Sequence, residues 1–350
     1  MAANSSIEWT DATWNPVRGC TRVSEGCRNC YAEIMAARFS KPGQWGHGIA
    51  TMVKLPDGKT DHRWTGAIAW ADSQVMLPLQ WTRPRRIFVN STSDLFHDQV
   101  KEEWLDHIFA VMMLSPQHTF QILTKRPDRM AMYMTAPRRS ANIARAVVDM
   151  AIADPSLLKR DPWPVASIGD IDLPDDIEMA YWPLPNVWLG TSVEDQASFN
   201  DRYPHLLETP AAVRFISAEP LLGPITLDNL PVPRPDWVIC GGESGPGARP
   251  MHPDWARSLR DQCAAANVPF FFKQWGEWAP EVGAVDGWSI DDDPETSRFP
   301  HRDWEGDHFG TPYTRQWMDD VDDDTVSRIG KKAAGRLLDG REHSDFPAVR

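Results

Sequence analysis

Long apolar runs are missing from this sequence of 350 residues. No run reaches about 18 apolar residues, so we expect no membrane-spanning helix. The first nine residues contain neither a basic stretch nor an apolar core, so we expect no secretion signal there. Cysteine is scarce, and its 5 residues are clustered rather than dispersed, which argues against a secreted disulfide framework. We therefore expect a cytoplasmic protein.

Basic residues are fewer than acidic residues, and the formal net charge is −13. This balance argues against a protein that coats nucleic acid by bulk electrostatics, although a local basic groove is still compatible with it. Much of the acid lies at 291–293 and 319–324, where we expect solvated loops. Tryptophan is abundant instead, with 17 residues, and exposed tryptophans can stack on bases.

Three of the cysteines, Cys20, Cys27 and Cys30, form a C-x6-C-x2-C motif in a polar loop that also contains glycine. Three thiolates can bind three irons of a [4Fe–4S] cluster and leave the fourth iron open to a ligand. Structural zinc is one alternative, but it normally takes four ligands. The other candidate ligands stand at no spacing typical of zinc; they are Cys240, Cys263, His47 and His62. Thiols without a metal are the third alternative, for which this loop offers little apolar burial.

A rhythm of short apolar runs, most of them followed by a helical segment, begins near residue 85. The runs are 86–90, 119–123, 186–190, 213–216, 236–240 and 268–272. Helices are predicted at 101–114, 195–208 and 253–266. Continuous apolar strands that alternate with helices indicate a parallel sheet covered on both faces. With one strand before the cysteines, the α/β class and a TIM-like full or partial (β/α) barrel are predicted, and a doubly wound sheet is the second possibility.

Residues 1–290 are expected to form this barrel domain, with two interruptions. Residues 40–82 are rich in Gly, Pro and Trp without a sustained period, so we expect an irregular rim or lid. Residues 135–185 are predicted to be an insertion that contains a helix at 138–153. Residues 291–350 are expected to form a C-terminal extension, an acidic tail that ends in a short basic helix at 329–338.

Charged residues follow several of these strands, and the active sites of both folds lie at the carboxyl ends of the strands. We expect catalytic roles for Lys125, Glu219 and Lys273. The basic residues at these and other positions are candidates for phosphate contacts; they are Lys125, Arg126, Arg249, Lys273, Lys331 and Lys332. The alternative is that they form ion pairs with the strand-end carboxylates, such as Glu219 with Lys125 or Lys273.

Beyond the cysteine motif, six segments resemble the phage-associated three-Cys-motif family, a bacterial and phage group of largely unknown function. They are residues 87–97, 121–127, 188–195, 215–223, 241–252 and 271–278. The resemblance implies a radical-SAM-like barrel with one [4Fe–4S] cluster on Cys20, Cys27 and Cys30. It further implies S-adenosylmethionine (SAM) as cofactor, its cleavage to a 5′-deoxyadenosyl radical, and an electron donor of the flavodoxin or ferredoxin type. The first cysteine spacing is longer than the C-x3-C of that superfamily.

The strand-end residues supply candidate SAM ligands in such a barrel. Where the superfamily usually contacts the methionine amino group, this sequence has Ser91, Ser93 and Asp94. Ribose hydroxyls are expected at Ser192 with Glu194, and the ribose or the substrate at Ser217 with Glu219. Adenine or phosphate is expected at the exposed backbone amides of a glycine-rich stretch, which contains Gly241, Gly242 and Glu243. The alternative for Ser91 and Ser93 is that they cap the next helix.

These observations support a radical SAM-type enzyme that acts on a nucleic-acid or nucleotide-like substrate. The rival hypothesis from another class is a non-catalytic, metal-stabilised module that binds nucleic acid or protein. A zinc hydrolase is disfavoured, because the sequence has no His–Glu pattern of metal ligands.

Overall fold

The computed structural model describes residues 5, 7–56, 58–159, 182–227, 234–280, 301–302 and 326–348. The chain divides into two compact units. Unit 1 comprises Met1–Ser192, Asn200–Phe215 and Val349–Arg350, and unit 2 comprises Val193–Phe199 and Ile216–Ala348. The predicted boundary at residue 290 and both acidic runs lie outside the described residues, as do residues 160–181 of the predicted insertion.

A seven-stranded sheet has the strand order β1-β6-β7-β8-β9-β10-β11. Its strands are β1 (Ala12–Trp14), β6 (Arg86–Val89), β7 (Thr119–Thr124), β8 (Val187–Ser192), β9 (Val213–Ala218), β10 (Trp237–Gly241) and β11 (Phe270–Gln274). The registers of β1 with β6, β6 with β7, β7 with β8 and β10 with β11 are all parallel. The predicted strands and the α/β class are therefore confirmed, and the order is consistent with a partial (β/α) barrel.

Burial on both faces explains why these strands are continuously apolar rather than alternating. All six residues of β8 are buried, including its polar end at Thr191 and Ser192. Gly190 is needed within it, because a Cβ at this position would lie 2.6 Å from the ring of Phe215. Large aromatic side chains fill the core of unit 1, where the ring of Trp9 lies 4.8 Å from that of Phe88. Burial of each such side chain contributes roughly 1.5–3 kcal/mol.

Three helices accompany the strands of unit 1. They are α3 (Glu102–Met113), α4 (Pro127–Thr135) and α5 (Arg139–Ala153). The predicted helices at 101–114 and 138–153 are confirmed. Helix α5 packs against α3, and its buried Arg139 donates to Asp106 at 2.7 Å. Helix α4 was not predicted; it begins with Pro127, at a position that suits proline, and is too short for a sustained helical period.

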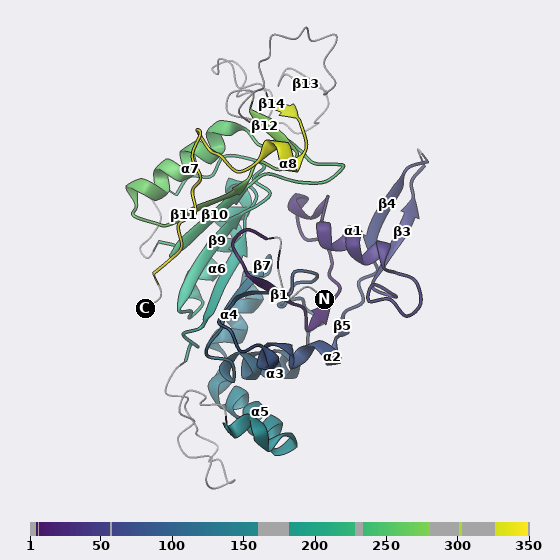
Figure 1. Ribbon diagram of the computed structural model, residues 1–350, viewed down its shortest axis with the longest axis vertical. Helices are drawn as coiled ribbons and strands as arrows, with labels where there is room; N and C mark the ends of the chain where they lie inside the picture. Colours follow the sequence, from purple (N-terminus) through teal and green to yellow (C-terminus); the bar gives the residue numbers. More distant parts are fainter. Residues whose placement is uncertain are drawn as a thin grey trace. The chain divides into compact units, whose positions relative to one another are not determined.

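The prediction of an irregular stretch at 40–82 is wrong in part. This stretch contains the hairpin strands β3 (Ala50–Lys54) and β4 (Thr60–Trp64), the short strand β5 (Ala69–Trp70), helix α2 (Asp72–Val75) and the 3-10 helix η2 (Leu77–Gln80). The hairpin lies beside helix α1 (Tyr31–Arg38) and extends away from it (Figure 1). Its strands lack an apolar period because four of the five residues of β3 are exposed.

Unit 2 contains helix α7 (Pro253–Ala265), which packs against β10 and β11. A small antiparallel sheet pairs β14 (Val326–Arg328) with β12 (Trp278–Pro280) and with β13 (His301–Arg302). The basic helix α8 spans Lys331–Ala334 and is shorter than predicted. The chain then returns along β11, where the Phe272 N–H donates to the His343 carbonyl at 3.0 Å. Helix α6 (Gln196–Glu208) confirms the prediction at 195–208.

The described part of the chain has no helix that combines the length and apolarity needed to cross a membrane.

Two glycines allow close backbone packing between the loops that follow β10 and β11. A Cβ on Gly242 would lie 1.9 Å from the Trp275 carbonyl oxygen, and one on Gly276 would lie 2.0 Å from the Glu243 carbonyl oxygen. The Gly242 N–H donates to the Gln274 carbonyl at 2.9 Å. At neighbouring Gly241, by contrast, an added Cβ finds its nearest atoms at 3.5 Å, an ordinary contact distance.

We therefore expect Gly242→Ala to destabilise unit 2 by about 1–3 kcal/mol or more, because the added methyl group forces the two loops apart. Gly241→Ala is the matched control and should cost clearly less. Urea unfolding of both variants measures the difference. Equal stability of the two variants would contradict the packing described here.

His118 is a buried imidazole, 1% exposed, at the start of β7. Its Nε2 lies 3.2 Å from the Pro78 carbonyl oxygen, and its Nδ1 has no hydrogen-bond partner among the described residues. Burial lowers the pKa of His118 below 6.5. The neutral ring is therefore the form that folding favours.

Because the folded-state pKa is the lower one, the unfolded chain binds the proton first as the pH falls. The contribution of His118 is fully present above about pH 6.5 and is lost as the pH falls through the folded-state pKa. His118→Gln should therefore flatten the decline of the unfolding free energy between about pH 7 and pH 5. The pKa values of His97 and His343 are also lowered. Their contributions are the same in wild type and variant, so the difference between the two pH profiles comes from His118. Parallel pH profiles of the two proteins would count against this assignment.

Candidate functional site

The cysteine motif lies on the loop that follows β1 and the short strand β2 (Val17–Arg18) in unit 1. Cys27 ends the 3-10 helix η1 (Glu25–Cys27), and Cys30 immediately precedes α1. Gly19 begins the loop with φ +92°, and a Cβ there would lie 2.2 Å from the Ala67 carbonyl oxygen. All three cysteines are free thiols and half-buried. The loop therefore places three thiols between a β-strand and a helix N-terminus.

The side chain of Arg126 holds the first cysteine from the end of β7. Its Nη1 lies 3.8 Å from the Cys20 Sγ atom. Its Nη2 donates to the Thr21 carbonyl at 3.2 Å and to the Thr21 hydroxyl at 2.8 Å. The guanidinium group, whose residue is 7% exposed, thus anchors the cysteine loop by its backbone and supplies a positive charge beside the sulfur.

Asp94 orients this arginine. One carboxylate oxygen, Oδ2, accepts from Arg126 Nη1 at 3.0 Å and from the Lys125 N–H at 3.0 Å. The other, Oδ1, accepts from the Thr124 hydroxyl at 2.6 Å and from the Phe96 N–H at 3.0 Å. Four donors use the full accepting capacity of a carboxylate. The geometry therefore gives Asp94 a positioning role toward Arg126.

His97 completes the network on the same side of the loop. Its Nδ1 accepts from the Gln99 N–H at 3.2 Å, which leaves the proton on Nε2. Nε2 then donates to the Thr21 hydroxyl at 2.9 Å. Burial lowers the pKa of His97, with a further contribution from Arg126, so the neutral ring is favoured. His97 is thus the hydrogen-bonding histidine of this loop.

Glu33 of α1 fixes the middle of the cysteine loop. It is only 1% exposed and accepts from Arg22 Nε at 2.8 Å. Its second oxygen accepts from the Trp64 N–H of β4 at 2.7 Å. Neither Arg22 nor Glu33 was predicted as a site residue, although a carboxylate in an otherwise alanine-rich helix was a usable signal. This buried pair ties the loop to both α1 and the hairpin.

Two of the thiols, Cys20 and Cys30, favour the protonated form in the absence of a cation. Burial raises the pKa of Cys20 to about 12, and Asp94 adds to the increase while Arg126 opposes it. Burial likewise raises the pKa of Cys30, and the backbone amides at the start of α1 act in the opposite direction. Cys30 raises the pKa of Cys20, and Cys27 raises that of Cys30, so the three thiols influence one another electrostatically.

Among the described residues, no group of three or more His, Cys, Asp or Glu side chains is arranged to hold a metal ion. The donor set nevertheless fits a cluster with three cysteine ligands in its chemistry. It offers three free thiols on one anchored loop, which interact electrostatically, and a buried guanidinium to offset the charge of the thiolates. Cluster binding here requires the thiols to be drawn together and deprotonated.

Ser91 and Ser93 hold the loop after β6 to the loop after β1. Ser91 Oγ donates to Asn15 Oδ1 at 3.2 Å, and Ser93 Oγ donates to the Val17 carbonyl at 2.8 Å. The alternative that they cap the next helix is wrong, because the N-cap of α3 is Lys101. A contact between these serines or Asp94 and the SAM amino group stays a prediction.

In unit 2, the predicted catalytic residues Glu219 and Lys273 form an ion pair. Lys273 Nζ donates to Glu219 Oε1 at 2.6 Å, and the side-chain amide of Gln274 donates to the same oxygen at 3.3 Å. Their side chains are 19% and 14% exposed, so the pair is largely screened from solvent. The sequence alternative of an ion pair is confirmed for Glu219 with Lys273, whereas a catalytic role of either residue stays a prediction.

The glycine-rich stretch of unit 2 differs from the expectation of exposed backbone amides. Gly241 and Gly242 are buried, and the Gly242 N–H is bonded to Gln274. Glu243 forms a bidentate pair with Arg249, at 2.9 Å to Nε and 2.7 Å to Nη2. The expectation of exposed amides is therefore wrong at these two glycines, because both are buried and the close packing of the loops after β10 and β11 requires a glycine at Gly242. Arg249 is engaged by a carboxylate.

The remaining predicted ligands lie at the ends of β8 and β9. Ser192, Glu194 and Ser217 are 6%, 2% and 1% exposed. The Ser192 carbonyl accepts from Arg202 Nη1 at 2.7 Å, and the Ser217 carbonyl accepts from the Val193 N–H at 2.9 Å. Their side chains are buried in this structure, and their contact with a ribose stays a prediction.

The sequence model of the family described as "Protein of unknown function (DUF5131)" matches residues 4–347. The chain belongs to this family. The match includes the cysteine loop of unit 1 and the Glu219–Lys273 pair of unit 2. No curated protein and no solved structure matches the chain.

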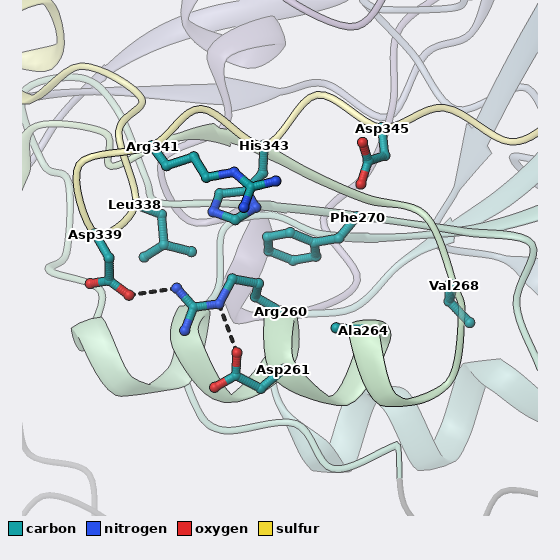
Figure 2. A pocket seen from close by; sticks show the side chains of 10 residues that line it. All are labelled: Arg260, Asp261, Ala264, Val268, Phe270, Leu338, Asp339, Arg341, His343 and Asp345. Carbon is teal, nitrogen blue, oxygen red and sulfur yellow. Dashed lines mark hydrogen bonds and ion pairs between the residues drawn. The ribbon is translucent and has the colours of Figure 1, made fainter.

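A cavity in unit 2 of this DUF5131 protein has none of these predicted ligands in its lining. Its volume is about 350 Å³, and helix α7 and the C-terminal segment line it (Figure 2). Arg260 spans one side, bonded to Asp261 and Asp339, while Phe270 and Leu338 supply apolar surface. With three carboxylates and three basic groups in its lining, the cavity favours no single charge class of ligand.

Removal of the Asp94 carboxylate should destabilise unit 1 strongly. Asp94→Ala leaves the buried Arg126 without its counter-charge, so we expect a loss of about 3–5 kcal/mol in unfolding free energy. Asp261→Ala is the control, because this carboxylate is exposed and Arg260 retains Asp339; its cost should be about 1 kcal/mol or less. Urea unfolding measures both. Equal costs would show that the Asp94–Arg126 pair does not organise the loop.

Proposed function

We propose that this protein is an iron–sulfur, radical SAM-type enzyme. Cys20, Cys27 and Cys30 would hold one [4Fe–4S] cluster, and the substrate would be a nucleic acid or a nucleotide-like molecule. The observation that carries the proposal is the anchored loop of three thiols at the end of the first parallel strand, with Arg126 Nη1 3.8 Å from Cys20 Sγ. Such strand ends are where the active sites of parallel α/β folds lie.

The finer description of the fold belongs to the same proposal. The strand order is that of a partial (β/α) series, and we infer a TIM-like half-barrel of the radical-SAM kind. We also assign the chain to the phage-associated three-Cys-motif group on the resemblance of its segments. A cytoplasmic location and an electron donor of the flavodoxin or ferredoxin type follow from the needs of a reducible cluster.

This chain's own residues would bind and orient the reactants. The cluster, when bound, would supply an electron for the reductive cleavage of SAM. Arg126 would offset the negative charge of the thiolate ligands, because it is held beside Cys20 by Asp94 and Thr21. The backbone amides at the start of α1 would do the same for Cys30.

A second candidate is a non-catalytic, metal-stabilised module that binds nucleic acid or protein. The observation that favours it is the engagement of strand-end charges in ion pairs: Asp94 with Arg126, Glu219 with Lys273, and Glu243 with Arg249. Groups committed to such pairs are less available for proton transfer or for substrate. The same cluster could then serve stability alone.

Anaerobic reconstitution with iron and sulfide tests the cluster directly. Wild type should bind about four irons per chain with cluster absorbance, and Cys27→Ala should lose most of this iron because one ligand is missing. Cys263→Ala is the matched control, since Cys263 is a buried thiol of α7, and its iron content should be unchanged. Zinc instead of iron in wild type, or full iron in Cys27→Ala, would refute the cluster assignment.

The reduced, reconstituted protein then separates the two candidates. Cleavage of SAM to 5′-deoxyadenosine supports the enzyme. An intact cluster of about four irons that never cleaves SAM on reduction supports the module instead.

A further inference from the structure

Three of the six basic residues predicted to meet phosphates are engaged in ion pairs. Arg126, Arg249 and Lys273 each bind a carboxylate of their own unit. A phosphate that approached these groups would have to displace a buried or half-buried carboxylate. A nucleic-acid substrate would therefore draw on cations other than these three.

The sequence holds such cations close to the cysteine motif. Residues 17–90 contain eleven lysines and arginines against five aspartates and glutamates, although the whole chain has a net charge of −13. This stretch includes the cysteine loop, α1 and the β3–β4 hairpin. The stretch that contains the motif is thus basic, although four of its cations form ion pairs; these are Arg22, Arg28, Arg63 and Arg86.

Within this stretch, α1 and the hairpin share a small core of their own. Ala36 and Ala37 of α1 pack against Ala50 of β3, with Trp45 and Trp64 at the edge. Gly46 closes the end of α1, because its N–H donates to the Phe39 carbonyl at 2.9 Å and a Cβ there would lie 2.0 Å from the Ala36 carbonyl oxygen. The loop between α1 and β3 is therefore held rigidly against the helix.

Two aromatic rings and a guanidinium group gather at this end of α1. The ring of Phe39 lies 6.2 Å from that of Trp45, with a tilt of 33°. The guanidinium carbon of Arg18 lies 5.9 Å from the centre of the Trp45 ring. Phe39 is 38% exposed and Trp45 is half-buried, so both present part of their rings to solvent. We call Arg18, Arg38, Phe39, Lys41 and Trp45 the Trp45 surface.

The cations of the Trp45 surface have no carboxylate partner among the described residues. Arg38 and Lys41 flank Phe39 in the chain, and both are exposed. Burial lowers the pKa of Arg18, and no carboxylate contributes to that change. A half-buried guanidinium without a counter-charge gains when an anion approaches, whereas Arg126 already has its carboxylate.

We propose that the Trp45 surface binds single-stranded nucleic acid, with phosphates on Arg18, Arg38 and Lys41 and a base stacked on Phe39 or Trp45. Alternating cations and aromatic faces are the combination by which proteins bind single strands without reading their sequence. A rigid aromatic platform suits an unpaired base, whose face is hidden within a duplex. An acidic peptide would use the cations but would gain nothing from the rings.

The position of the Trp45 surface links it to the cysteine loop. Arg18 stands two residues before Cys20, and α1 runs from Tyr31, next to Cys30, to Arg38. Eight helical residues span about 12 Å. This inference depends on the proposed function in one respect only, namely that the surface would deliver a nucleotide to the cysteine loop.

Fluorescence anisotropy with a labelled oligodeoxythymidine of about 16 nucleotides tests the proposal, with oligouridine as a second arm for RNA. We expect binding at low salt that weakens as salt rises. Arg38→Gln combined with Lys41→Gln should reduce the slope of log K against log salt by about 0.7 for each phosphate contact removed. Phe39→Leu keeps apolar contact but loses the aromatic face, so its affinity should fall by about 5- to 150-fold if a base stacks there.

The matched control combines Arg145→Gln with Arg234→Gln, two exposed arginines that give the same change in net charge. This control should bind as wild type does, and thermal unfolding checks that all variants fold. Absence of binding at low salt, an unchanged slope in the Arg38–Lys41 variant, or equal competition by polyglutamate would overturn the proposal.

The binding assay needs neither reductant nor SAM. Oligonucleotide binding without cleavage of SAM would support nucleic-acid binding by the Trp45 surface and refute the proposed enzyme. Cleavage of SAM by a protein that binds no oligonucleotide would support the proposed enzyme and refute nucleic-acid binding by the Trp45 surface.

Discussion

The buried ion pair between Asp94 and Arg126 is the constraint on which the cysteine loop depends. Asp94 follows β6 and Arg126 follows β7, so the pair joins the ends of two neighbouring parallel strands. Arg126 also donates hydrogen bonds to Thr21, and its guanidinium group lies close to the Cys20 sulfur. A buried guanidinium needs both its counter-charge and its hydrogen bonds, because desolvation of either partner alone is costly. The first cysteine thus takes its place from residues about 100 positions away in the chain.

The need of a buried charge for a counter-charge explains many of the polar contacts within the two units. Buried charges at strand ends are acceptable only as pairs, and Glu219 with Lys273 and Glu243 with Arg249 satisfy it in unit 2. Arg18 and Arg38 are exceptions, since no carboxylate accompanies them among the described residues. Arg18 ends the short strand β2, Arg38 ends α1, and both are at least partly in contact with water. A folded protein that keeps such cations beside exposed aromatic rings has a surface suited to an anionic, planar partner.

Much of the fold could be predicted, because parallel strands buried on both faces leave a continuous apolar signature. The six runs from β6 to β11 and the helices α3, α5, α6 and α7 were visible in this way. The β3–β4 hairpin was not, since β3 is exposed along four of its five residues and is held by α1 through Ala50. Helix α4 was missed for a related reason: nine residues with a proline start give too little periodicity.

In the candidate site, the spacing of residues in the sequence identified the three cysteines but did not identify the residues that contact them. The sequence by itself determined that three thiols share one loop after the first strand, that charged residues follow later strands, and that the chain is α/β. Only the tertiary structure decided that Arg126 reaches Cys20, that Lys273 pairs with Glu219, and that Gly242 serves backbone packing. The physical reason is that ion pairs and close packing join segments 30 to more than 100 residues apart, and no local pattern encodes which distant groups will meet.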